Sequence, residues 1–129
     1  MALLNINDNE KNEQVAKVFS VMREQIGEVP KPMRLFGISP AIMMTYINSI
    51  EYYKNHPSLT FALLSSIRYL VATETCYNSC MAFNGKMLKM QGMTDEDIAK
   101  LKSDLGTAPL EEKEIAMLRF VVTGIREPE

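Results

Sequence analysis

The two cysteines of the chain lie four positions apart, in the stretch T-E-T-C-Y-N-S-C-M-A-F-N-G that runs from residue 73 to residue 85. A thiolate is the nucleophilic form of cysteine, and a second thiol close by can resolve an oxidised partner into a disulfide. In a reducing compartment, such a pair is more often catalytic, redox-active or merely packed than joined in a permanent disulfide. Cys76 and Cys80 are therefore the candidate catalytic residues.

The surrounding residues predict a helix that begins at Thr73 or Thr75 and carries both cysteines. Cys76 would then lie in the first turn, where unpaired N–H groups and the helix dipole favour a thiolate. Cys80 would lie one turn further in and be the more buried of the two. Side chains at i and i+4 of a regular helix have Cβ atoms about 5–6 Å apart, whereas a disulfide needs about 3.5–4.5 Å. A disulfide between these cysteines therefore requires a distorted helix start.

Peroxide reduction also needs a base for the thiol and a proton for the departing oxygen. Between residues 73 and 92 there is no histidine, and the only acidic residue is Glu74. Glu74, Tyr77 and Asn78 are the nearby side chains that can position a water or a proton. The single histidine, His56, lies in N-H-P between two predicted helices, where we expect a solvated turn residue.

The composition is typical of a soluble globular protein with one domain over residues 1–129. The chain has 47% hydrophobic and 23% charged residues, and its net charge is −2. That balance gives no basic surface for nucleic acid or for an anionic membrane. The N-terminus has no signal-peptide pattern, and the most apolar stretch is interrupted by Arg68. We expect a cytoplasmic protein.

The sequence predicts neither a cofactor nor a metal. A structural zinc site needs about four ligands, and two cysteines with a distant His56 fall short unless subunits share a site. No Gly-rich phosphate loop follows a strand, so nucleotide binding has no motif here.

Apolar residues recur at helical spacing along almost the whole chain, and no period-2 strand is evident. The first helix is expected to start at a cap on Asp8 or Asn9 and to stop at Gly27. One helical turn is expected in the connector V-P-K-P-M-R-L-F-G that follows. Further helices are predicted over residues 40–55, 61–73, from 73 or 75 to about 92, and over 95–105.

Three start signals support these boundaries. Pro40 stands at a first helical position after Ser39, Ser58 or Thr60 caps the helix over 61–73, and Thr94 with Asp97 approximates a capping box. The last helix is expected to open at Pro109, with an apolar seam that consists of Ile115, Leu118, Val122 and Ile125. Helices joined by short turns imply an all-α bundle, and the ten methionines are interpreted as core filling.

The sequence resembles the carboxymuconolactone decarboxylase and alkylhydroperoxidase AhpD-like proteins over roughly residues 29 to 128. The resemblance is carried by V-P-K-P-M-R-L-F-G-I-S-P-A-I-M-M, H-P-S-L-T-F-A-L-L-S-S-I-R-Y-L-V-A-T-E-T-C, M-Q-G-M-T-D-E-D-I-A-K-L and P-L-E-E-K-E-I-A-M-L-R-F-V-V, in that order. It implies an AhpD-like helical bundle that assembles into trimers or hexamers.

Redox-active members of that family carry the pattern E-x11-C-x-[HS]-C-x3-H, whose Glu and His relay protons. Alignment of Cys80 with the second cysteine places Tyr77 at the first cysteine, Ser79 at the middle polar site, Asn84 at the histidine and Ser65 at the glutamate. Neither a serine nor an asparagine can carry charge near neutral pH. The resemblance thus implies the fold of the family with a degenerate proton relay.

Two hypotheses of different class follow. In the first, the protein is a thiol-dependent hydroperoxide or disulfide reductase in which Cys80 attacks and Cys76 resolves, or the reverse. In the second, it is an inactive, homo-oligomeric helical binding or scaffold protein of the same family. A decarboxylase-type enzyme ranks lower, because the cationic and acid–base residues that a lactone acid requires are not evident around the motif.

Overall fold

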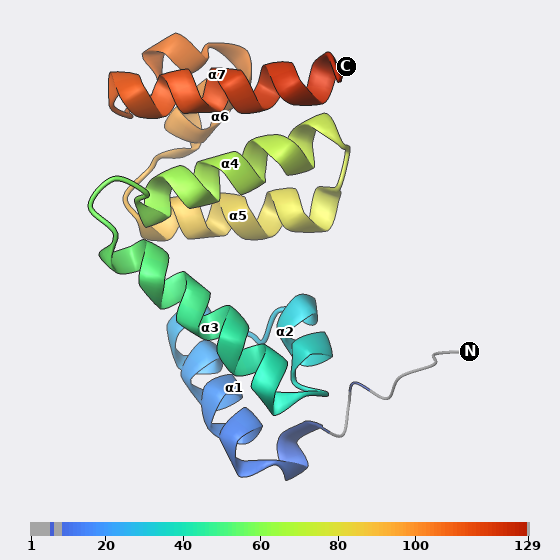
Figure 1. Cartoon of the computed structure of the whole chain (residues 1–129). Helices are drawn as coiled ribbons and strands as arrows, with labels where there is room; N and C mark the ends of the chain where they lie inside the picture. The colour runs from blue at the N-terminus through green and yellow to red at the C-terminus, as the bar shows by residue number, and fades with distance from the viewer. Residues whose placement is uncertain (1–5, 7–8, 129) are drawn as a thin grey trace. The chain divides into compact units, whose positions relative to one another are not determined.

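The structure is a computed structural model that describes residue 6 and residues 9–128, and the described residues form helices without a strand (Figure 1). Two compact units are present, residues 1–52 and residues 53–129. The described part of the chain has no helix long and apolar enough to cross a membrane. The helices are η1 (Asn9–Lys11), α1 (Glu13–Ile26), α2 (Lys31–Phe36), α3 (Pro40–Asn55), α4 (Phe61–Glu74), α5 (Asn78–Met90), α6 (Asp95–Ser103), η2 (Leu105–Thr107) and α7 (Glu112–Arg126).

The first helix of the N-terminal unit starts later than predicted. The side chain of Asn12 caps α1, because its Oδ1 accepts hydrogen bonds from the N–H groups of Gln14 and Val15 at 3.0 and 3.2 Å. The predicted cap at Asn9 is wrong, since this residue opens the 3-10 turn η1, and the alternative Asp8 lies outside the described residues. The predicted stop at Gly27 is confirmed by its left-handed φ of 85°.

Two prolines shape the connector that follows α1. Pro30 caps α2 and Pro32 lies in its first turn, where a missing N–H has no intrahelical partner to lose. The connector therefore holds a six-residue helix rather than the single turn expected. The long helix α3 begins at Pro40 and ends at Asn55, as predicted.

The core of the N-terminal unit is built from α1, α2 and α3, together with Val29 in the connector before α2. The rings of Phe36 and Tyr46 pack at its border with centroids 4.9 Å apart. Partly buried side chains from α1 and α3, such as Val18 and Ile47, cover the cluster. The buried members are Val15, Phe19, Val29, Met33 and Met43.

The C-terminal unit is organised around α4, which packs against both α5 and α7 (Figure 1). The predicted cap of α4 is confirmed at Thr60, whose Oγ1 accepts a hydrogen bond from the N–H of Leu63 at 3.1 Å. The helix contributes apolar residues to more than one neighbour, as its broad apolar surface predicts. The buried core of this unit consists of Leu63, Leu70, Leu88, Ile98, Leu101, Ala108 and Leu118.

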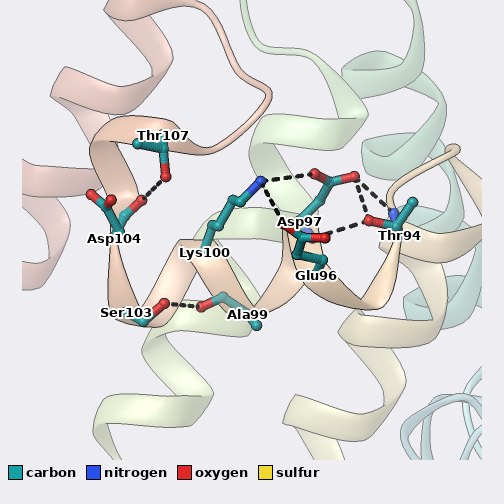
Figure 2. Close-up of polar contacts among 8 residues, drawn as sticks. All are labelled: Thr94, Glu96, Asp97, Ala99, Lys100, Ser103, Asp104 and Thr107. Atoms are coloured by element: carbon teal, nitrogen blue, oxygen red, sulfur yellow. Dashed lines mark hydrogen bonds and ion pairs between the residues drawn. The ribbon is translucent and has the colours of Figure 1, made fainter.

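The capping box predicted for α6 is confirmed (Figure 2). The hydroxyl of Thr94 accepts from the N–H of Asp97 at 3.1 Å, and the carboxylate of Asp97 accepts from the N–H of Thr94 at 3.0 Å. Lys100 adds ion pairs with Glu96 at 3.2 Å and Asp97 at 3.9 Å. The helix ends at Ser103, two residues before the predicted end, because the chain enters the 3-10 turn η2.

The start of α7 is set by two glutamates rather than by Pro109, so the predicted opening at Pro109 is wrong. Glu111 is the N-cap, and its N–H donates to Glu114 Oε2 at 3.1 Å. The other carboxylate oxygen of Glu114 accepts from the hydroxyl of Thr60 at 2.9 Å. Glu114 is only 7% exposed. Its carboxylate therefore joins the N-terminal caps of α4 and α7.

We expect Gly37→Ala to destabilise the N-terminal unit by about 1–3 kcal/mol, because the site is already filled. A methyl group at Gly37 would lie 2.9 Å from the ring of Phe19 and 3.1 Å from Cγ1 of Val15, both of which are buried. Urea unfolding measures this loss. Gly124→Ala is the matched control: it lies in open space within a helix, and we expect a gain of about 0.5–1 kcal/mol. Equal effects of the two variants would contradict this assignment.

Candidate thiol site at the α4–α5 turn

The two cysteines lie on either side of the start of α5, because α4 ends before them. The N–H of Tyr77 donates to the carbonyl of Ala72 at 2.8 Å, and the N–H of Cys76 donates to the carbonyl of Thr73 at 3.2 Å. Cys76 has a φ of 56° and is the non-glycine residue with positive φ in the described chain. These bonds and this backbone form a Schellman motif, with Cys76 at the left-handed position that glycine usually occupies.

The predicted start of the cysteine helix at Thr73 or Thr75 is therefore wrong. Thr73 belongs to the last turn of α4, Thr75 caps that helix, and α5 begins at Asn78. Both cysteines lie further towards the N-terminus of the helix than predicted. Cys76 precedes the helix, and Cys80 is the third residue of its first turn.

The exposure of the two thiols differs in the predicted direction. Both cysteines are free, Cys76 is exposed, and Cys80 is partly buried. The N-cap residue Tyr77 makes no side-chain hydrogen bond to the first turn of α5 among the described residues, and it is 60% exposed. The N–H groups of this turn, including those of Ser79 and Cys80, are thus not engaged by a capping side chain. Such groups can bind an anion at the start of a helix.

The two positions aligned with the proton relay of the family lie in the interior, on α4 and α5. Ser65 and Asn84 are 2% and 5% exposed. Asn84 Nδ2 donates to the carbonyl of Cys80 at 2.8 Å, and Ser65 Oγ accepts from Gln91 Nε2 at 3.2 Å. Both side chains are therefore hydrogen-bonded within the chain. The hydrogen bond from Gln91 to Ser65 was not predicted, because no pattern in the sequence indicates it.

Glu74 is held in an ion pair at the end of α4. Its carboxylate accepts two hydrogen bonds from the guanidinium of Arg126 in α7, at 2.8 and 2.7 Å. The hydrogen bond from Arg126 lowers the pKa of Glu74, although partial burial opposes the shift. Glu74 is thus kept ionised and is unsuited to deliver a proton. Arg126 lies 52 positions away along the sequence, which is why the pairing was not predicted.

His56 stabilises a turn rather than a thiol. Its Nδ1 accepts hydrogen bonds from the N–H groups of Ser58 and Leu59 at 3.1 and 2.8 Å, just before α4. This agrees with the turn residue predicted from N-H-P. Within residues 9–128, no group of three or more His, Cys, Asp and Glu side chains is arranged to hold a metal ion.

A hollow of about 350 Å³ lies at the opposite end of the α4–α5 pair from the cysteines. Its lining includes Thr60, Gln91, Asp97 and Glu114, and neither cysteine contributes to it. Cys76 itself is exposed at the turn, where a molecule from solvent can reach it.

Comparison of the chain with protein-family models, with curated proteins and with solved structures found no match. The resemblance to the AhpD-like proteins remains a prediction that rests on the sequence segments quoted above. The function is therefore inferred from the geometry of the turn and from that resemblance.

We expect Cys76→Gly to stabilise the reduced protein by about 0.5–1 kcal/mol, because a left-handed backbone disfavours a residue with a Cβ atom. The measurement is urea unfolding in the presence of reductant. Cys76→Ala is the control, since it removes the sulfur and keeps the Cβ atom. Equal stability of the glycine and alanine variants would show that the turn carries no such strain.

We expect Arg126→Gln to change how stability depends on pH. The lowered pKa of Glu74 means that the ion pair contributes fully above the ordinary carboxyl pKa of about 4.5 and is lost as the pH falls through the lower value in the folded protein. The variant should be less stable at neutral pH and should lose less stability on acidification. Lys102→Gln is the control, because Lys102 is the smallest contributor to that shift. Parallel curves for wild type and Arg126→Gln would contradict this.

Proposed function

We propose that the chain is an AhpD-like, thiol-dependent hydroperoxide or disulfide reductase that uses Cys76 and Cys80. The observation that supports the proposal is the α4–α5 turn. It holds two free thiols, one exposed before the helix and one in the first turn of α5. A peroxide can reach the turn from solvent, and the first-turn N–H groups can stabilise negative charge on sulfur or on oxygen bound to it.

The reaction uses the two thiols in sequence. The thiolate of Cys80 attacks the peroxide, the O–O bond breaks, and the departing alkoxide takes up a proton to become an alcohol. Cys80 is left as a sulfenic acid. The sulfur of Cys76 then attacks it, the S–O bond breaks, and water leaves as the disulfide forms. An external dithiol reduces this disulfide by exchange and is itself oxidised.

The position of Cys80 in the first turn of α5 favours it as the attacking residue, with Cys76 as the resolving one. The exposure of Cys76 supports the reverse assignment, because it gives a peroxide direct access. Single variants separate the two. A sulfenic acid that persists in Cys76→Ser identifies Cys80 as the attacking thiol, and one that persists in Cys80→Ser identifies Cys76.

Proton transfer is the weak element of this site. Ser65 and Asn84 are neutral, buried and hydrogen-bonded within the chain, and Glu74 is paired with Arg126. Loss of a general acid or base typically lowers a rate by about 10²–10⁴. We therefore propose a slow peroxidase, in the reducing environment of the cytoplasm, that uses water as its proton source.

The second candidate is an inactive homo-oligomeric binding or scaffold protein with the same fold. The observation that favours it is the burial of Ser65 and Asn84, which the chain uses for internal hydrogen bonds. The resemblance implies a trimer or hexamer for either candidate. A decarboxylase-type activity ranks third, because Arg126, which reaches the end of α4, is engaged by Glu74.

Incubation of the reduced protein with an organic hydroperoxide should consume two thiols per chain and form one intramolecular disulfide. Thiol titration and intact-mass measurement follow both changes. Cys76→Ser and Cys80→Ser should each abolish turnover with an external dithiol, while Met90→Ala, at an exposed residue at the far end of α5, should retain it. Two thiols that stay unchanged after prolonged exposure would reject the reductase and favour the scaffold.

A further inference from the structure

Reduction of a hydroperoxide at Cys80 releases an alkoxide, which has to gain a proton as it leaves. The two residues aligned with the proton relay of the family are buried and hydrogen-bonded within the chain. The carboxylate of Glu74 is kept ionised by Arg126. The remaining candidates for a proton donor in the turn are the hydroxyl groups of residues 73–80.

Residues 73–80 carry four hydroxyl groups, and two of them are already engaged. Those of Thr73 and Thr75 donate to backbone carbonyl groups one turn earlier in α4, at 2.9 and 2.7 Å. Ser79 is an alcohol, and its acidity is close to that of the alcohol that leaves. A phenol is a far stronger acid than an alcohol and gives a proton to an alkoxide readily. Tyr77 therefore carries the hydroxyl group that suits this transfer.

The backbone of Tyr77 is fixed, whereas the fold makes no use of its side chain. The N–H of Tyr77 donates to the carbonyl of Ala72 at 2.8 Å, and its carbonyl accepts from the N–H of Met81 at 3.1 Å. The side chain is 60% exposed and makes no capping hydrogen bond to α5 among the described residues. N-cap positions favour Ser, Thr, Asp and Asn, so an aromatic ring contributes nothing to the start of this helix. The phenol is thus open to water on a fixed backbone.

Tyr77 and Cys80 occupy the N-cap and N3 positions of α5. The start of a helix brings these two positions together, as a capping box shows, in which each side chain bonds to the backbone of the other residue. Residues three apart on a helix have Cβ atoms about 5–6 Å apart, which is comparable with the length of a tyrosine side chain. The phenol of Tyr77 can therefore reach an oxygen atom that is bound next to the sulfur of Cys80.

We propose that Tyr77 is the general acid of the peroxide step, an inference that rests on the proposed reductase with Cys80 as its attacking thiol. The thiolate sulfur of Cys80 bonds to the outer oxygen of the hydroperoxide and is oxidised to a sulfenic acid. The O–O bond breaks, and the phenol gives its proton to the departing alkoxide, which leaves as an alcohol. The phenolate then takes a proton from water, so water remains the ultimate source of protons.

The leaving group of the peroxide tests this role. Tert-butyl hydroperoxide releases a basic alkoxide that needs a proton, whereas peracetic acid releases a carboxylate that does not. The background is Cys76→Ser, which stops the reaction at the sulfenic acid and removes the second thiol as a proton donor. In this background, Tyr77→Phe should slow sulfenic acid formation by tert-butyl hydroperoxide at least about tenfold and by peracetic acid less than about twofold. Trapping with dimedone and intact-mass measurement follow both rates.

Tyr52→Phe in the same background is the matched control, because it removes the same hydroxyl group from a residue of α3 that is 59% exposed. Both rates should then stay unchanged. Equal slowing of both peroxides by Tyr77→Phe, or no slowing of either, overturns the inference and leaves the reductase intact. A Cys76→Ser protein that does not react although the wild type does overturns the inference alone, because Cys80 is then not the attacking thiol. Wild-type protein whose thiols react with neither peroxide overturns the reductase together with this inference.

Discussion

The left-handed backbone at Cys76 is the constraint on which the candidate site depends. Two backbone hydrogen bonds close the last turn of α4: the N–H of Tyr77 donates to Ala72, and the N–H of Cys76 donates to Thr73. Both can form only if Cys76 adopts a positive φ. That conformation ends α4 before the cysteines and lets α5 start afresh at Asn78. It also places the first cysteine outside any helix and the second inside the first turn of α5. A regular helix through the same residues would have placed both thiols on one helix face.

The turn is held by an ion pair at the end of α4 and by the neutral side chain of Asn84 at the start of α5. The ion pair between Glu74 and Arg126 ties the end of α4 to the last turn of α7, two residues before the left-handed residue Cys76. Beneath the turn, Asn84 bonds to the backbone at Cys80, one helical turn away. The backbone of the turn is thus fixed by these contacts, and the side chains that make them have little capacity for proton transfer. Such an arrangement is compatible with both candidates, a slow thiol reductase and an inactive scaffold protein. The two candidates differ in whether the thiols react.

Much of the helical pattern could be predicted from local chemistry. Thr60, the Thr94 and Asp97 pair, Pro40 and Gly27 act within one turn of themselves, and each sets a boundary where the sequence predicts it. The predicted helix starts were wrong where a stronger capping residue lay close to the residue that the sequence predicted as the cap. Asn12 replaced Asn9 as a cap, and reciprocal bonds between Glu111 and Glu114 set the start of α7 beyond Pro109. The break at Cys76 was missed because cysteine stands where glycine usually marks the end of a helix.

The sequence by itself determined that the described chain is helical, where most helices begin, and that two thiols are four positions apart. These properties follow from periodicity and capping, which act over a few residues. Only the tertiary structure decided that Arg126 engages Glu74 and that Thr60 donates a hydrogen bond to Glu114. These pairs lie more than 50 positions apart. Their contacts depend on how whole helices pack, which no local pattern specifies.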